Sequence, residues 1–373
     1  MGDILHALPA VTALRQAHPG WVIDWVVEPR WRALLSAEGA NNDLETPRGS
    51  RENLTSWAKA RGNSQGPNVR AKALTYQPNP ARPVVDGLYP AATKEWRGSP
   101  LSRKTLHEIT QLRRALRAGG YDAVIDLQGA VRSAVIGRMA ACQRLIGEAE
   151  PRERVARKLF TERVVTHGAH VIQQDLELAS AVAGDDLKPV TPWLPVDPAA
   201  EAWVDGVLRR NAPETAVLIN PGAGWGAKRW PVERYAAVAQ GLVDRGMRVL
   251  VNAGPGEEML AETMVRGAGG AVTPVACNVE QLIALTRRVG LAIAGDTGPL
   301  HLACALGRPV VGIYGPTDPS RNGPFGTRFK VLRSPESRRD HTRNATPEAG
   351  LLTILPEDVL QAADELLAGE NAE

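Results

Sequence analysis

The second half of the chain alternates β-rich segments with helical ones, and this alternation constrains the fold more than any other feature. Short runs rich in Val, Ile and Leu separate longer stretches in which apolar residues recur at helical spacing. This order is typical of a parallel sheet with helices on both faces. We expect strands at 215–220, 247–253, 271–276, 290–295 and 309–315, and helices at 199–210, 231–245, 256–267, 279–288, 299–306 and 356–368.

The first half shows the same alternation in a less regular form. The chain opens on a helix that stops at Pro19 and Gly20, which are helix-ending residues. Segments between about 36 and 83 are rich in Asn, Gly, Pro, Ser and Arg without periodicity, which predicts an exposed, partly disordered insertion. We further expect strands at 21–27 and 121–129, helices at about 29–35, 102–118 and 131–141, and a basic segment at 144–163.

The length of the chain predicts two domains. Its 373 residues exceed the size at which a single core stops growing, roughly 250–300 residues. A short extended stretch with prolines at 189, 192, 195 and 198 is typical of an interdomain linker. We expect an N-terminal domain at 1–190, a C-terminal domain at 196–355, and a C-terminal helix and tail at 356–373.

Composition excludes several classes of protein. The 44 Lys and Arg residues nearly balance the 41 Asp and Glu residues, so net charge gives no indication of a nucleic-acid partner. Cys142, Cys277 and Cys304 are far apart in the sequence and predict free thiols in a reducing compartment. No apolar run of about 18 residues and no signal-peptide pattern occurs, so we expect a cytoplasmic protein.

The segment AGDTGPLHLACALG carries the sharpest chemical signal. A strand ends at Gly295, and Pro299 lies where the first turn of a helix begins. The free N–H groups of that turn, with Thr297 and Gly298, predict an anion cradle. The alternative is an ordinary strand-to-helix turn that Asp296 caps. His301 in the first helical turn favours the functional interpretation.

Two further loops follow strands in the same half. In NPGAGWGAKRWP, glycines permit close approach to a phosphate, and Lys228 supplies a positive charge. This loop matches neither a P-loop nor a dinucleotide fingerprint. In NAGPGEE, Glu257 and Glu258 lie at a helix start, where a favourable interaction with the helix dipole explains them without a ligand.

The N-terminal half offers one carboxylate and one basic cluster. Asp3 precedes the first helix, and position alone favours a helix cap over a carboxylate in a cleft. The stretch 94–117 carries seven Lys or Arg residues against Glu95 and Glu108. A solvated helix face explains such a run, and an anionic membrane or a phosphorylated partner is the functional alternative.

Taken together, these segments resemble glycosyltransferase family 9, the ADP-heptose:lipopolysaccharide heptosyltransferases. The resemblance covers most of the chain outside 36–83, and WVIDWVVEPRW and DTGPLH are most similar to the first heptosyltransferase of the group. It rests on MGDILHALPAVTALRQAHPG, YDAVIDLQGAVRSA, NPGAGWGAKRWP, AGPGEE, AGDTGPLHLACALG and IYGPTDP.

This resemblance implies an α/β protein of the GT-B architecture, with two Rossmann-like domains facing a cleft and the last helix returning toward the first domain. It implies an inverting transfer of heptose from ADP-heptose to a Kdo residue of lipid A, without a metal or other cofactor. It also implies peripheral contact with the inner membrane and no nucleic-acid partner.

Family motifs carried over to matching positions imply roles for individual residues. Asp3 resembles the general base, and Lys228 the group that stabilises the departing diphosphate. Residues that resemble donor contacts are Gly222, Ala223, Gly224, Glu257, Asp296, Thr297, Gly298 and His301. Residues that resemble acceptor contacts are Lys94, Arg97 and Arg152.

The chain departs from the family pattern in three respects. The family has a strand and a Ser/Thr-containing loop before the Gly-Asp pair, so we expect either a truncated chain or a first sheet without its central strand. The insertion at 36–83 is atypical, and Glu95 and Gly98 lie where basic residues are expected. The alternatives are therefore transfer of a different nucleotide-activated sugar on the same scaffold, or a nucleotide-sugar-binding protein without turnover.

Overall fold

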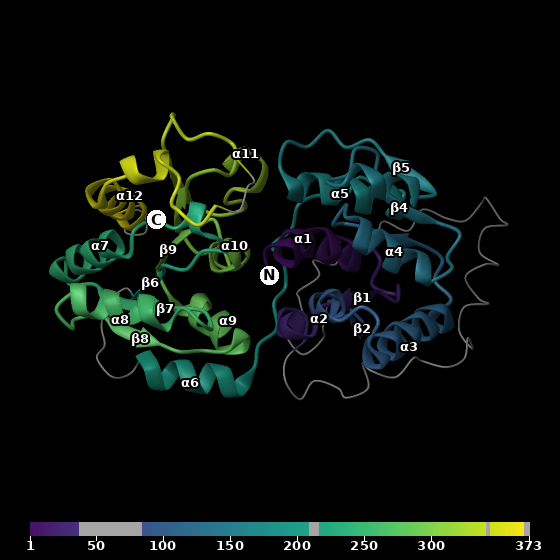
Figure 1. The fold of residues 1–373 in the computed structure, drawn as a ribbon, viewed down its shortest axis with the longest axis horizontal. Coiled ribbons are helices and arrows are strands. Elements are labelled where there is room, and N and C mark those ends of the chain that lie inside the picture. The colour runs from purple at the N-terminus through teal and green to yellow at the C-terminus, as the bar shows by residue number, and fades with distance from the viewer. Residues whose placement is uncertain (37–83, 209–215, 341–343, 369–373) are drawn as a thin grey trace, which may run out of the picture.

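The computed structural model describes residues 1–36, 84–208, 216–340 and 344–368, and it places them in two α/β halves (Figure 1). Almost the whole expected insertion at 36–83 lies outside the described residues. No described helix combines the length and the apolar character that a bilayer crossing requires.

The C-terminal half contains a six-stranded parallel sheet with the order β11-β10-β9-β6-β7-β8. All five expected strands are present, and β11 is an additional strand that the sequence patterns did not indicate. The three central strands are buried along their whole length because helices cover both faces. The strands are β6 (Ala216–Asn220), β7 (Arg248–Asn252), β8 (Thr273–Val275), β9 (Leu291–Gly295), β10 (Val310–Tyr314) and β11 (Phe329–Arg333).

Six described helices of this half lie close to the predicted ranges, and the short helix α11 was not predicted. Asn278 caps α9 by accepting the N–H of Gln281, while Gln281 reaches back to Asn278, a reciprocal pair that defines the helix start. The helices are α6 (Pro198–Leu208), α7 (Val232–Asp244), α8 (Glu258–Gly267), α9 (Val279–Arg288), α10 (Gly298–Ala305), α11 (Pro319–Asn322) and α12 (Pro356–Ala368).

The position of α12 corrects one expectation. The helix does not return to the N-terminal half but packs against α7 and strands β9 to β11 of the C-terminal sheet. Its stripe of Val359, Ala362, Ala363 and Leu366 is buried in the core of that half. Because this stripe recurs at three- and four-residue spacing, the helix buries it on the nearest apolar surface.

The N-terminal half carries two parallel sheets, β1-β2 and β3-β4-β5, instead of one continuous sheet. The Tyr121 hydroxyl links the two sheets by donating to Asp24 at 2.7 Å. The strands are β1 (Asp24–Val27), β2 (Gly87–Pro90), β3 (Val124–Ile125), β4 (Leu145–Glu148) and β5 (Glu162–Val164).

Several sequence predictions for this half need correction. The strands expected at 21–27 and 121–129 are shorter, and the helix expected at 29–35 is the 3-10 helix η1 (Pro29–Leu34). Asp126 ends β3 early because its carboxylate accepts the N–H groups of Gln128 and Gly129, which turns the chain. The basic segment at 144–163 contains β4, η4 (Arg154–Lys158) and part of β5.

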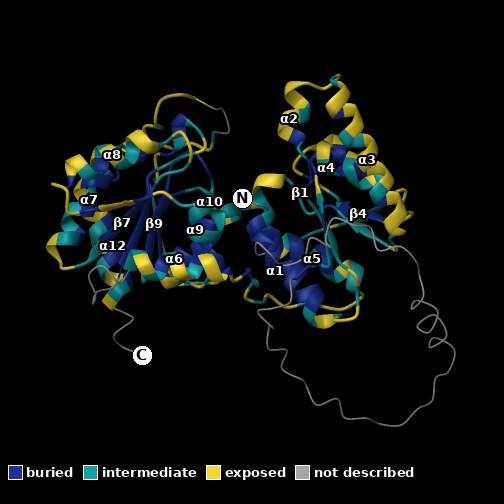
Figure 2. Cartoon of the chain, turned by 90° about the horizontal axis from the view of Figure 1, so that it is seen from below, coloured by how far each residue is buried: buried dark blue, intermediate teal, exposed yellow. Residues whose placement is uncertain are grey.

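The helices of the N-terminal half follow the expected order, with α2 and α5 in addition. Ser102 caps α3 by accepting the N–H of Thr105, and Gly120 ends that helix in the left-handed conformation. Figure 2 shows α3 largely exposed, whereas α1 and α5 are largely buried. The helices are α1 (Gly2–Ala17), α2 (Thr93–Gly98), α3 (Arg103–Gly119), α4 (Val131–Met139) and α5 (Val171–Ala183).

Helix α1 joins the two halves. It packs against α5 of its own half and against α10 of the other half, as Figure 1 also shows. Leu5 and Leu8 belong to one apolar cluster with Leu302 of α10 and Leu285 of α9. Because the first turns of α1 and α10 meet here, the residues at both helix starts lie at the interface between the halves.

Candidate active site

Lys228 lies at the carboxyl end of the C-terminal sheet. It ends the 3-10 helix η6 (Gly226–Lys228), which follows β6. Its ammonium group forms an ion pair with Asp296 and lies 4.2 Å from the centre of the Trp225 ring. Only 10% of the Lys228 side chain and 9% of the Asp296 side chain are exposed. The predicted phosphate-binding lysine is therefore held beside a buried carboxylate.

Asp296 follows β9 and has two side-chain partners. One oxygen binds Lys228, and the other lies 3.2 Å from Nε2 of His301. Burial by itself would raise the pKa of Asp296, but the hydrogen bond from His301 and the charge of Lys228 outweigh burial and hold the pKa well below its usual range. Asp296 is thus an ionised group that holds two side chains, and it does not cap α10.

The start of α10 is where the sequence predicts an anion cradle. Thr297 is the N-cap residue, and its hydroxyl donates to the carbonyl of Gly295 at 3.2 Å instead of capping the helix. Gly298 and Pro299 form the first turn. The N–H groups at a helix start lack partners within the helix, and the helix dipole favours an anion there. This end of α10 follows β9 at the sheet edge that also carries Lys228.

The two glycine-containing loops of this half touch each other. A Cβ placed on Gly222 would lie 2.1 Å from Oε2 of Glu257, so the carboxylate packs directly on the backbone of the other loop. The same oxygen accepts the N–H of Gly254 at 3.2 Å. The predicted donor residues Gly222 and Glu257 are therefore brought together, and Ala223 and Gly224 follow in the same loop.

Asp3 lies in the first turn of α1, and the N-cap position belongs to Met1, so the interpretation as a helix cap is wrong. The Asp3 carboxylate is exposed and accepts a hydrogen bond from Nε2 of Gln128 at 2.7 Å. Gln128 comes from the loop after β3. This contact places Asp3 next to the carboxyl end of the N-terminal sheet, where open α/β sheets bind ligands.

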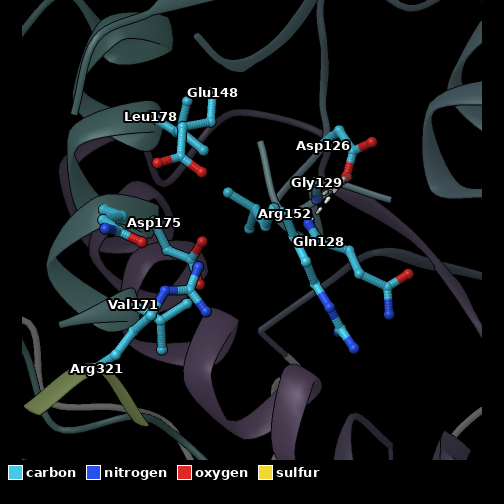
Figure 3. Close-up of a pocket in the computed structure, with 11 residues that line it drawn as sticks. Asp126, Gln128, Gly129, Glu148, Arg152, Val171, Asp175, Leu178 and Arg321 are labelled. Carbon is cyan, nitrogen blue, oxygen red and sulfur yellow. Dashed lines mark hydrogen bonds between the residues drawn. The ribbon is translucent and has the colours of Figure 1, made fainter. Parts of the chain in front are cut away.

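A pocket lies at the same place, at the carboxyl ends of β3 and β4 (Figure 3). Gln128 and Arg152 line it, and in Figure 3 their side chains extend in the same direction. Arg321 of the C-terminal half also contributes, so both halves form the pocket. The structure thus brings the predicted acceptor residue Arg152 to the side of the sheet that holds Asp3.

Asp175 of α5 is an unusual member of this pocket. It is 3% exposed, and its Oδ2 has no hydrogen-bond partner among the described residues. Burial, together with the negative charge of Glu148, raises the pKa of Asp175 well above its usual range. The pocket therefore contains a carboxyl group that favours its neutral form.

The other two predicted acceptor residues lie elsewhere. Lys94 and Arg97 are exposed on α2 and do not line the pocket. The backbone N–H of Lys94 donates to Glu28 at 3.2 Å. Their role in acceptor binding stays a prediction.

Sequence reasoning missed Gln128, His6 and Arg321. Gln128 carries a signal, because the polar residues of DLQG directly follow a strand. His6 lies in α1, where its Nε2 is 3.2 Å from Nδ1 of His301, and no local pattern indicates a contact across 295 residues. Arg321 reaches the pocket from the far half, which only the packing of the two halves shows.

The structure has two facing α/β halves, with a buried lysine at the sheet edge of one and an exposed carboxylate at that of the other. This is the arrangement of the GT-B class of glycosyltransferases. Known proteins support this class. Residues 109–351 match the family model for glycosyltransferase family 9 (heptosyltransferase). The chain belongs to this family and is an enzyme.

Individual relatives extend the similarity over nearly the whole chain. The chain is 28% identical to lipopolysaccharide heptosyltransferase 1 of Escherichia coli K12 over 94% of this chain and 95% of the relative. Among solved structures, E. coli heptosyltransferase WaaC with ADP is 27% identical, with a TM-score of 0.71 over 98% of this chain and 97% of the other. The same enzyme with ADP-2-deoxy-2-fluoro heptose is 26% identical, with a TM-score of 0.68 over 98% and 96%.

Proposed function

We propose that this enzyme transfers heptose from ADP-heptose to a Kdo residue on the lipid A side of the lipopolysaccharide inner core, with inversion at the anomeric carbon. The main observation in support of the donor is the position of Lys228. It lies beside Asp296 at the edge of the C-terminal sheet where α10 begins. Relatives that are heptosyltransferases, and the WaaC complexes with ADP and its fluorinated heptose, support the choice of donor.

The donor side has the charge that a departing ADP requires. Breaking the bond between the anomeric carbon and the diphosphate leaves negative charge on the phosphate oxygens. The Lys228 ammonium and the N–H groups of the first turn of α10 are positive or partly positive groups suited to that charge. We therefore propose that no metal ion or other cofactor is needed. Gly222, Ala223, Gly224 and Glu257 would hold the nucleotide.

The acceptor side has a base within reach of a pocket. In the proposed reaction, an acceptor hydroxyl loses its proton to Asp3 as its oxygen bonds to the anomeric carbon from the face opposite to ADP. Gln128 holds the Asp3 carboxylate at 2.7 Å and so fixes its direction. Arg152 in the adjoining pocket is suited to the carboxylate of an acidic sugar such as Kdo.

The experiment that tests this proposal is turnover with a panel of ADP-, UDP- and GDP-sugars and a Kdo-containing acceptor. We expect release of ADP from ADP-heptose only when acceptor is present, and NMR of the product should show inverted anomeric configuration. Faster turnover with another nucleotide sugar would show that ADP-heptose is not the donor. Binding of every donor without any turnover would favour a binding protein.

The exposed face of α2 and α3 supports a further part of the proposal, peripheral contact with an anionic membrane on the cytoplasmic side. Of the seven basic residues between 94 and 117, only Lys104 forms an ion pair with another described residue. Leu101 and Leu106 on the same segment are 86% and 51% exposed. Cations beside exposed apolar side chains match the charge and depth profile of an anionic bilayer surface.

Vesicle flotation tests this membrane contact. Because each Lys or Arg near an anionic surface contributes about 1 kcal/mol, changing both Arg113 and Arg114 to Gln should weaken binding to phosphatidylglycerol vesicles about tenfold or more. The matched control changes Arg229 and Arg266, two exposed arginines of the other half, to Gln. Equal binding by both double variants, or equal binding to neutral vesicles, would contradict a docking face on α3.

A further inference from the structure

A chain of side-chain contacts links Lys228 to helix α1 across the interface of the two halves. Lys228 binds one oxygen of Asp296, and the other oxygen lies 3.2 Å from Nε2 of His301. Nδ1 of His301 lies 3.2 Å from Nε2 of His6. His301 is 7% exposed and His6 is 6% exposed, so the contacts between them lie in the interior.

The partners decide which ring nitrogens carry protons. Asp296 is ionised and only accepts hydrogen bonds, so Nε2 of His301 donates to it. Nδ1 of a neutral His301 is then an acceptor, and Nε2 of His6 donates to it. In this arrangement both rings are neutral, and the positive charge that balances Asp296 is the Lys228 ammonium.

A third histidine lies at the same interface but outside this chain. His170 is 6.0 Å from His6 between ring centres. Its Nδ1 accepts the N–H of Ile172, so its Nε2 donates to the carbonyl of Gly323. Among the three rings, only His301 touches a carboxylate.

Other charged groups near His6 disfavour a proton there. Burial, followed by the proximity of His301 and His170, lowers the pKa of His6 well below its usual range, and Arg321 acts in the same direction while Asp296 opposes it. The groups that face the His301–His6 pair are therefore Asp296 with Lys228 on one side, and His170 and Arg321 on the other. Of the two rings, His301 is the one whose Nε2 lies 3.2 Å from the Asp296 carboxylate.

We infer that His301 becomes protonated when the donor diphosphate draws the Lys228 ammonium away from Asp296, and that His6 is the positioning residue that accepts a hydrogen bond from the protonated ring. This inference rests on the proposed function, because it requires the diphosphate to bind Lys228. It states that donor binding is coupled to the uptake of one proton from solvent.

The proton balance is simple. Before binding, Asp296 is paired with the Lys228 ammonium. After binding, that ammonium pairs with phosphate, and an imidazolium at His301 pairs with Asp296 through Nε2–H. The proton that His6 donated through Nε2 passes to Nδ1 of His301, and a proton from water adds to Nδ1 of His6. One proton enters the protein, and both rings keep their mutual hydrogen bond in the reversed direction.

This linkage gives donor binding a definite pH dependence. If one proton is taken up with the ligand, the affinity falls about tenfold for each unit of rising pH. The range from pH 8 to 9 is suitable, because a phosphate with a second pKa of about 6 is fully ionised there. The proton also lies on the contact between α10 and α1, the helix that carries Asp3.

Titration calorimetry with ADP tests the inference without any transfer reaction. At pH 8, the binding enthalpy is measured in buffers of different ionisation enthalpy. The slope of the binding enthalpy against the ionisation enthalpy of the buffer should correspond to about one proton taken up per ADP. Between pH 8 and 9, the Kd for ADP should rise about tenfold. Imidazole nitrogen spectra of the 15N-histidine-labelled protein should show the His301 ring changing from neutral to doubly protonated on addition of ADP.

Variants separate this role from a merely structural one. His301→Gln keeps a donor for Asp296 but cannot take up a proton, so uptake and the pH dependence should fall to near zero. In Lys228→Met, Asp296 has already lost its ammonium partner and His301 is already protonated, so ADP should bind more weakly and without uptake. His6→Phe should reduce the uptake, because the protonated ring loses its acceptor. The matched control His170→Gln should retain it.

The outcomes distinguish this inference from the proposed function. ADP binding without proton uptake in the unaltered protein, or full uptake in His301→Gln, would overturn the inference and leave the donor assignment intact. Failure of the unaltered protein to bind ADP at all would overturn both. If a variant does not fold, the nitrogen spectra of the unaltered protein decide the matter.

Discussion

Replacing Lys228 by Met tests the donor site most directly, because Met keeps much of the side-chain volume and removes the charge. Loss of one preorganised group that stabilises charge in the transition state lowers kcat by about 10²–10³, or roughly 3–4 kcal/mol. The Lys228 side chain is only 10% exposed, so little water is present to replace its charge. We expect kcat for the transfer of heptose to fall by about this factor.

The same change should also destabilise the fold. Breaking one side of a buried ion pair costs about 3–5 kcal/mol, and here His301 keeps one hydrogen bond to Asp296, so we place the cost near the lower limit. The C-terminal half that carries Lys228 falls in the range of about 150–250 residues, for which about 3 kcal/mol corresponds to a decrease in Tm of roughly 6–12 °C. Steady-state kinetics at a temperature well below the Tm and a separate thermal melt, both at pH 7.5, measure the two effects separately.

Arg229→Met is the matched control, because Arg229 is the next residue along the chain and is exposed. Its kcat and Tm should stay close to those of the unaltered enzyme, since exposed charges contribute about 0–1 kcal/mol. If Lys228→Met transferred sugar at the parent rate, or if both variants lost the same activity, the diphosphate role of Lys228 would be refuted.

Three further predictions concern other parts of the molecule. Asp3→Asn should lower turnover by about 10²–10⁴ while leaving the Kd for ADP within about twofold, and transfer at the parent rate would exclude Asp3 as the base. The pKa of Asp175 is raised in the folded protein, so the folded state loses stability as pH rises from about 4 through that pKa. Asp175→Asn should therefore raise the Tm by roughly 2–8 °C at pH 8 and by less at pH 5. An equal change in Tm at both pH values would contradict this reasoning. A Cβ on Gly226 would lie 1.8 Å from the backbone oxygen of Ala345, so Gly226→Ala should lower the free energy of unfolding by about 1–3 kcal/mol in denaturant titrations, whereas Gly224→Ala, which has open space, should not.

Local sequence patterns were sufficient for most helices and strands of the C-terminal half, with β11 and the four-residue α11 as exceptions. Helix α9 has the same bounds as predicted, because apolar spacing marks its buried face and Asn278 with Gln281 closes its first turn. The N-terminal half was harder to predict, since β3 consists of two residues and Asp126 turns the chain at once. A strand that short has no periodicity to detect.

For the candidate site, the sequence determined the donor loops and tertiary structure decided their partners. The segment AGDTGPLH predicts an anion cradle because a strand, a turn and a proline-started helix follow one another within a few residues. The role of Asp296 as holder of Lys228 and His301 depends on a loop 68 residues away in sequence. The His6 to His301 contact depends on the packing of α1 against α10.

The physical reason for this division is the range of the interactions involved. Helix periodicity, caps and turns arise from hydrogen bonds and steric contacts between residues a few positions apart, so a single sequence contains them. The burial of apolar surface over whole elements decides how the two halves meet and which surface covers α12. It thereby also decides which carboxylate accepts the hydrogen bond from Gln128. The hydrophobic effect does not specify which residues become neighbours, so only the folded structure shows where it brings charged groups together.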